Sequence, residues 1–271
     1  MSTLGVIGNI SRDVALYPDG RRFEQLGGAA LYVARAANRA GLSSAPISVI
    51  GADLSWIRHD VRLADLDLSH VKVMPGASCA FRLTYAIDDR LWDIDCAFGV
   101  AEALTGHCLA VIGQHDRYHV CCRRPLDVAA VLSSLADAEL PFSADFHLAS
   151  ASQLISAAAP LLPHAQVVFV NAAEFIALAS EMDPRRLAAV VVSDGPREVT
   201  LLQGGQACAA VRPQRTGVVE VTGAGDALAG AFLAAAAHGL TGEDALRTAV
   251  AAATESTRHP GFAIPHQQDV S

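Results

Sequence analysis

Short apolar runs alternate along the chain with longer segments in which apolar residues recur at helical spacing. Runs of four to eight apolar residues without polar alternation are typical of parallel strands that are buried on both faces. Strand and helix in regular alternation predict an α/β fold with a mostly parallel central sheet and helices on both of its faces. We expect strands at residues 4–8, 46–51, 109–113, 118–122, 141–145, 166–171 and 190–195. We expect helices at residues 27–41, 53–64, 126–139, 150–159 and 242–258.

Two segments depart from this pattern and predict hairpins. Residues 78–94 show partial alternation of apolar and polar side chains about Asp88-Asp89, which is typical of a hairpin with one face in water. Together with residues 12–24 it predicts a small β lid, with lid segments near 12–24 and 76–98. A second hairpin is expected from residues 198–203 and 207–211.

The most informative stretch is Val218 to Gly239. Its apolar start predicts a strand, and Thr222 to Asp226 (TGAGD) predicts a glycine turn that opens an alanine-rich helix. The first N–H groups of a helix lack partners and carry the positive end of its dipole, so such a turn favours an anion. A carboxylate at the same turn suits a general base that faces a phosphate, although a capping Asp after a flexible turn is the plainer interpretation of this motif.

Composition narrows the classes of function. A chain of 271 residues, 52% apolar and without a low-complexity linker, predicts a single domain over residues 1–271. The net charge of −8 argues against a nucleic-acid surface. Six cysteines without metal-ligand spacing predict reduced thiols and a cytoplasmic protein, and neither a leader nor a membrane-spanning stretch is expected. Lys72 is the only lysine, which excludes a GxxxxGK[ST] phosphate loop and a protein-kinase lysine.

The stretch around TGAGD resembles the signature of the ribokinase-like, or PfkB, family of carbohydrate and nucleoside kinases, with Glu220-Val221 in place of the usual Asp-Thr. The resemblance continues in order along nearly the whole chain. It implies a three-layer α/β/α domain with a small β lid and ATP-dependent phosphorylation of a hydroxyl. In that scheme Asp226 is the general base, and the backbone of Gly223, Ala224 and Gly225 forms the anion hole.

The same resemblance implies a substrate site near the N-terminus. Asp13 stands where relatives hold a hydroxyl pair, which suits a carboxylate with two acceptor oxygens. Gly27 and Gly28 stand where the backbone passes close to the substrate. Tyr32 replaces the short polar residue of many sugar kinases, so we expect a nucleoside or substituted cyclitol to be phosphorylated better than ribose or fructose.

Cofactor residues follow in the second half of the chain. Asn171 to Glu174 (NAAE) matches the family's N-x-x-E motif, in which Asn171 caps a helix and Glu174 holds a water-coordinated Mg²⁺. Ser193 and Gly195, with Gly223 and Gly225, are the expected ATP contacts. A monovalent cation beside the signature loop occurs in relatives. Asp145-Phe146-His147 keeps the Asp of a family motif but lacks its Asn and Arg.

These patterns predict an ATP- and Mg²⁺-dependent kinase of a small polyol, with a small molecule as partner and neither nucleic acid nor membrane. A homodimer through the lid is an additional expectation. One alternative is a kinase of another substrate class in the same superfamily. The second is a catalytically idle sensor that binds sugar or nucleotide, and consumption of ATP distinguishes it from a kinase.

Overall fold

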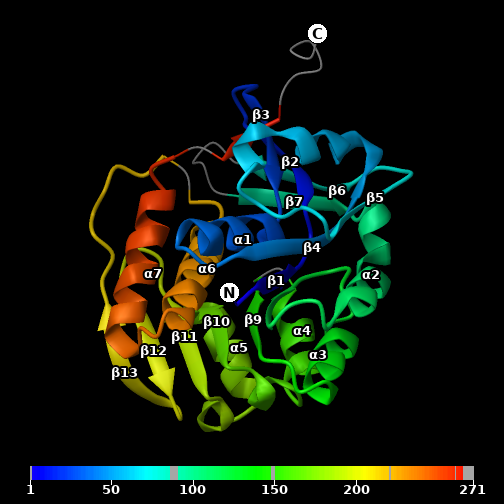
Figure 1. Ribbon diagram of the computed structural model, residues 1–271. Helices are drawn as coiled ribbons and strands as arrows, with labels where there is room; N and C mark the ends of the chain where they lie inside the picture. Colours follow the sequence, from blue (N-terminus) through cyan, green and yellow to red (C-terminus); the bar gives the residue numbers. More distant parts are fainter. Residues whose placement is uncertain (1, 86–90, 148–149, 220, 260, 265–271) are drawn as a thin grey trace.

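The computed structural model describes residues 2–264 except 86–90, 148–149, 220 and 260. Its main sheet has nine strands in the order β13-β12-β11-β10-β9-β8-β1-β4-β5 (Figure 1). The strands from β11 to β5 are parallel, and β12 and β13 add an antiparallel edge. The strands are β1 (Leu4–Ile7), β4 (Ser44–Gly51), β5 (Val71–Met74), β8 (Arg117–Cys122), β9 (Phe142–Phe146), β10 (Val167–Asn171), β11 (Ala189–Ser193), β12 (Val199–Gln203) and β13 (Gln206–Val211).

Helices cover both faces of this sheet, because side chains along each central strand alternate between two hydrophobic cores. In β10, Val167 and Phe169 belong to one core, whereas Val168 and Val170 belong to the other. The first core contains α1 (Ala29–Arg39), α6 (Ala224–Ala237) and α7 (Gly242–Ser256). The second contains α2 (Leu104–Val111), α3 (Val128–Asp137), α4 (Ala151–Ala158) and α5 (Ala172–Glu181). The expected three-layer α/β/α architecture is confirmed.

Helix α6 lies at the centre of the first helical layer, between α1 and α7 (Figure 1). Residues 227–235 of this helix are all buried. A Cβ added to Gly230 would lie 2.3 Å from the carbonyl oxygen of Val33, so the two helices approach at backbone distance there. Small residues in α6 therefore set how closely the signature helix packs against α1.

A second sheet of five strands, in the order β14-β3-β2-β6-β7, lies above the main sheet in Figure 1. The predicted hairpin is the antiparallel pair β6 and β7, and its expected turn at Asp88-Asp89 lies outside the described residues. Strand β14 pairs with β3 and brings the C-terminal segment to this sheet. The strands are β2 (Ser11–Leu16), β3 (Arg22–Gly27), β6 (Cys79–Tyr85), β7 (Leu91–Ala97) and β14 (Phe262–Ala263).

Three local predictions were wrong. Residues 109–113 form no strand, because Leu104, Cys108 and Val111 are buried at helical spacing in α2 and its following turn. Residues 53–64 form 3₁₀ rather than α-helix. The five 3₁₀ helices are η1 (Ala52–His59), η2 (Val61–Leu63), η3 (Gly99–Ala103), η4 (Leu162–His164) and η5 (Pro184–Arg186).

The third error concerns the apolar residues before the signature turn. Val218, Val219 and Val221 are exposed and belong to no strand. Val219 donates one backbone hydrogen bond to the carbonyl of Thr257 after α7. A β-branched run needs a neighbouring strand to form a ladder, and the tertiary structure places a helix end beside it instead.

Among the described residues, no helix combines the length and the apolar character that are needed to cross a lipid bilayer.

Candidate active site

Polar side chains gather where the parallel strands of the main sheet end. Asn9 follows β1, Arg123 follows β8, Asp145 lies near the end of β9, and Asn171 ends β10. Ser193 ends β11 as the register partner of Asn171. The carboxyl ends of parallel strands lie at one edge, where open α/β sheets bind their ligands.

The start of α6 reaches the same edge. Gly223 precedes the helix with φ of 80°, a left-handed conformation that glycine adopts without steric cost. No side chain caps this helix end, and the N–H of Ala224 donates to the carbonyl of Val221 at 3.2 Å, so a ligand at this turn would compete with that bond. Asp226 lies in the first turn. The glycine turn and the carboxylate of Asp226 therefore lie together at the start of α6.

Arg123 connects Asp226 to Asp145. Its Nη2 donates to Oδ2 of Asp145 at 2.9 Å and to Oδ1 of Asp226 at 3.1 Å. Burial raises the pKa of both carboxyl groups, and the guanidinium opposes that rise by stabilising their charged forms. Nearby His119 is fully buried and stays neutral, since burial lowers its pKa to about 3.

Sequence reasoning missed Arg123. The expected family motif places an arginine shortly after Asp145, and none is found there. In this chain the guanidinium belongs to Arg123, which follows β8. Strand β8 pairs in parallel with β9, with Tyr118 opposite Phe142, so the ends of the two strands are neighbours. Two features of the sequence could have identified Arg123: the family's arginine is missing after Asp145, and an arginine follows the strand expected at residues 118–122.

Asp13 lies in β2 in a pocket of buried oxygen atoms. Burial raises the pKa of Asp13 to about 6. Its Oδ1, Oγ of Ser11 and Oδ1 of Asn9 are buried and have no hydrogen-bond partner among the described residues. A Cβ on Gly27 would lie 2.0 Å from Oδ2 of Asp13, so only glycine leaves room for this carboxylate. The three unpartnered oxygens suit a ligand that carries several hydroxyl donors.

Gly28 precedes α1 as its N-cap residue, and Tyr32 lies one turn into the helix. Gly28 has φ of 107°, and a Cβ there would meet the carbonyl oxygen of Asn9 at 2.2 Å. The hydroxyl of Tyr32 donates to the carbonyl of Leu26 at 3.2 Å. The ring of Tyr32 packs against Gly223, where an added Cβ would lie 3.0 Å from Cδ1. Tyr32 thus lies directly beside the signature turn.

Asn171 and Glu174 form a capping box at the start of α5. Oδ1 of Asn171 accepts from the backbone N–H of Glu174 at 2.9 Å, and Oε2 of Glu174 accepts from the N–H of Asn171 at 2.8 Å. Burial raises the pKa of Glu174 to about 6. Oε1 of Glu174 accepts no hydrogen bond from the described residues, so this carboxylate retains an oxygen that fits a hydrated Mg²⁺.

Gly195, with φ of 55°, turns the chain after Ser193.

Comparison with known proteins identifies relatives along nearly the whole chain. Residues 1–269 match the model of the pfkB family of carbohydrate kinases. A cytidine kinase of Thermococcus kodakarensis is 26% identical over 274 residues, covering 94% of this chain and 96% of the relative.

Two solved structures share the fold. A nucleoside kinase of Burkholderia thailandensis in complex with inosine is 20% identical, with a TM-score of 0.81 over 96% of this chain and 92% of that chain. A nucleoside kinase of Methanocaldococcus jannaschii, an archaeal member of the ribokinase family, is 17% identical, with a TM-score of 0.81 over 96% and 93% of the two chains. The chain therefore belongs to the pfkB family of carbohydrate kinases, phosphotransferases whose acceptor is an alcohol group.

Proposed function

We propose that this kinase transfers the γ-phosphoryl group of ATP to a hydroxyl of a nucleoside, with Asp226 as the general base. The observation that carries the proposal is the position of Asp226 in the first turn of α6, at a helix start that no side chain caps and 3.1 Å from Nη2 of Arg123. Phosphoryl transfer depends mainly on alignment and on neutralisation of charge, and this arrangement supplies both.

Asp226 accepts the proton of the substrate hydroxyl, whose oxygen bonds to the γ-phosphorus while the bond from that phosphorus to the ADP oxygen breaks. Backbone N–H groups of Gly223, Ala224 and Gly225 stabilise the negative charge of the transferring group at the positive end of α6. Arg123 keeps Asp226 ionised and fixes its direction before transfer. Once Asp226 has taken up the proton, its attraction for Arg123 weakens, and the guanidinium is available to the phosphoryl oxygens.

Glu174 would hold Mg²⁺ through water, with Asn171 fixing the carboxylate by the capping box. Bound Mg²⁺ supplies positive charge that offsets the charge of the nucleotide phosphates. Ser193 and Gly195 would contact ATP at the end of β11. A monovalent cation beside residue 221 belongs to the same proposal as an optional activator.

Asp13 would bind a hydroxyl pair of the substrate, with Gly27 and Gly28 giving close backbone approach. The unpartnered oxygens of Asn9, Ser11 and Asp13 support a polyol as ligand. The resemblance to a cytidine kinase favours a nucleoside. The hydroxyl of Tyr32 donates to the carbonyl of Leu26. The ring of Tyr32 would therefore contact a flat group of the substrate or support the signature turn.

The test measures ATP consumption with cytidine, inosine, adenosine, a cyclitol, ribose and fructose, with and without K⁺. We expect a nucleoside to have the highest kcat/KM, and Asp226→Asn to lower kcat by about two to four powers of ten while nucleotide binding stays nearly unchanged. Turnover of Asp226→Asn within threefold of wild type would contradict the role of Asp226. ATP consumption with none of these alcohols would favour an idle sensor, and ribose or fructose as the best substrate would overturn only the choice of nucleoside.

We also propose that the five-stranded sheet acts as the lid and pairs two copies of the chain. The side chains of Phe23 and Trp92 on its strands are 51% and 79% exposed. Large apolar side chains on a small sheet favour burial against a partner. Light scattering should give a dimer for wild type and a monomer for Trp92→Glu, and a wild-type monomer at micromolar concentration would exclude this assembly.

A further inference from the structure

A cavity of about 630 Å³ lies on the outer side of the signature turn, between α1, the end of α7 and the segment that leads into β14. Gly223 lines one wall of this cavity, and Tyr32 and Phe262 supply aromatic walls. Its volume is in the range of pockets that bind small organic ligands. It therefore adjoins the candidate active site, with which it shares Tyr32 and Gly223.

Three arginines line the cavity, namely Arg35, Arg39 and Arg62. Arg35 and Arg39 are one turn apart on α1, which places them on the same face of the helix. Burial lowers the pKa of Arg35, and the charges of Arg39 and Arg62 lower it further. Arg35 and Arg39 therefore place two positive charges beside one space, and an anion bound there would offset their repulsion.

The acidic groups around the cavity leave Arg35 and Arg39 without a carboxylate partner among the described residues. Asp60 pairs with Arg62 at 2.6 Å. Glu255 pairs with Arg258 at 3.0 Å and with His259 at 3.1 Å. Asp65 contributes only a longer-range attraction to Arg35.

Arg35 is held in place by an aromatic ring rather than by a hydrogen bond. Its guanidinium carbon lies 4.0 Å from the centroid of the Phe262 ring. Its Nε is buried and has no hydrogen-bond partner in the described structure. A buried donor without a partner is costly, so a fixed guanidinium with an unused donor points to a ligand with acceptor oxygens.

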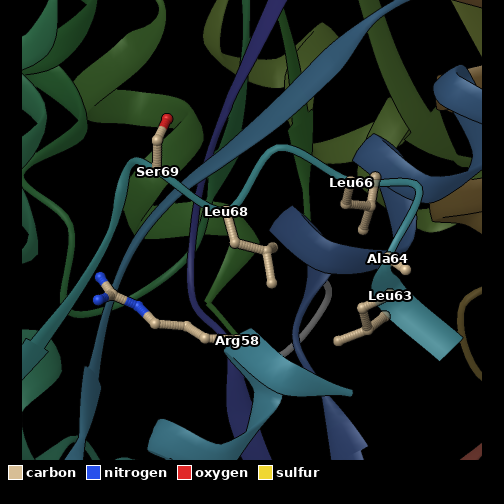
Figure 2. A pocket seen from close by; sticks show the side chains of 6 residues that line it. All are labelled: Arg58, Leu63, Ala64, Leu66, Leu68 and Ser69. Carbon is tan, nitrogen blue, oxygen red and sulfur yellow. The ribbon is translucent and has the colours of Figure 1, made fainter. Parts of the chain in front are cut away.

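A second hollow in the structure lacks these features. Figure 2 shows it lined by Leu63, Leu66 and Leu68, with Arg58 at one end. The guanidinium of Arg58 already donates to the carbonyl of Val71. The hollow therefore has one guanidinium that already donates to a backbone carbonyl, whereas three guanidinium groups line the cavity beside Gly223.

We propose that the cavity on α1 binds a phosphate-bearing small molecule, with Arg35 and Arg39 as its charged ligands. Guanidinium groups match phosphate in geometry and charge, and the Phe262 and Tyr32 rings offer apolar contact to the rest of the ligand. The phosphate is either free inorganic phosphate or the phosphate of an organic molecule such as a nucleotide.

Occupation of this cavity would act on the proposed chemistry through Tyr32. The ring of Tyr32 lines the cavity and packs on Gly223, whose backbone belongs to the proposed anion hole. A ligand that fixes Tyr32 thereby fixes the signature turn. The binding site itself does not depend on the proposed role of Asp226.

The test is calorimetric titration of the full chain with inorganic phosphate and, separately, with AMP, both without Mg²⁺. Arg35→Gln and Arg39→Gln should each weaken binding of at least one probe by about tenfold or more. Arg186→Gln is the matched control, because Arg186 is exposed in η5 and does not line the cavity. It should leave both affinities within twofold of wild type.

Arg123→Gln tests whether binding occurs in this cavity or in the candidate active site, because Arg123 does not line the cavity. We expect it to leave the arginine-dependent binding unchanged. If Arg35→Gln fails to fold, Arg39→Gln decides, since Arg39 is exposed at the surface of α1. If inorganic phosphate binds and its binding requires Arg35 and Arg39, the ligand is inorganic phosphate. If only AMP binds in this arginine-dependent way, the ligand is an organic phosphate. Absence of binding by both probes, or binding that ignores both substitutions, would overturn the proposal.

Discussion

Arg123 and Asp226 are 103 positions apart in the chain, yet Nη2 of the arginine lies 3.1 Å from Oδ1 of the aspartate. The same nitrogen also binds Asp145, so one guanidinium serves two buried carboxylates. Removing it would leave two uncompensated negative charges close together.

We therefore expect Arg123→Gln to lower kcat by roughly 10²-fold, the usual share of one charged donor in an active site. Loss of the guanidinium also removes the influence that opposes the burial-raised pKa of Asp226. The acidic limb of the kcat profile should consequently move to higher pH. A purely structural role for Arg123 would lower kcat without moving that limb, and Arg123→Lys should restore part of the shift.

Glu174→Gln tests the metal assignment. The glutamine keeps an acceptor oxygen for the N–H of Asn171, so the capping box and the melting temperature should change little. It removes the negative charge that we assign to hydrated Mg²⁺. The Mg²⁺ concentration for half-maximal rate should rise severalfold at pH 7.5, and an unchanged titration would reduce Glu174 to a helix cap.

The pKa of about 6 for Asp13 predicts a pH dependence of substrate binding. Below that pH the carboxyl gains a proton and loses part of its capacity to accept two hydroxyl groups. The affinity for the best nucleoside, measured by calorimetry without ATP and Mg²⁺, should fall as the pH is lowered from 7 to 5. Asp13→Asn should bind the nucleoside weakly at both pH values. Glu174 has a similar pKa, so Glu174→Gln is the control: it should retain the pH dependence of the wild type. Equal wild-type affinity at pH 5 and 7 would argue against Asp13 as the acceptor.

Two glycine substitutions form a matched pair for stability. Gly230→Ala places a methyl group 2.3 Å from the carbonyl oxygen of Val33, and the helices α1 and α6 must separate to admit it. We expect a loss of about 1–3 kcal/mol in the free energy of unfolding. Gly106→Ala in α2 meets no atom within 4 Å and should stabilise the protein by about 0.5–1 kcal/mol. Denaturant unfolding measures both, and a neutral Gly230→Ala would show that the α1 and α6 contact is adaptable.

The sequence by itself determined the features that depend on neighbours a few positions apart. The TGAGD turn with its alanine-rich helix and the Asn171 to Glu174 cap both form where they were predicted. Local chemistry is sufficient in these cases, because a left-handed glycine, a capping side chain and helical spacing act within one or two turns. The alternating apolar runs also sufficed for the α/β class.

The tertiary structure alone decided the pairings between distant segments. The order of β1, β8 and β9 brings Arg123 to Asp145, and the packing of α6 brings Asp226 to the same guanidinium. Residues 109–111 became the end of α2 for the same kind of reason, because a short apolar run is compatible with strand or helix until tertiary packing selects one of them. The stacking of Arg35 on Phe262 likewise required β14 to join the small sheet. Such contacts depend on strand order and helix packing, and a pattern of apolar and polar positions within one segment carries no record of them.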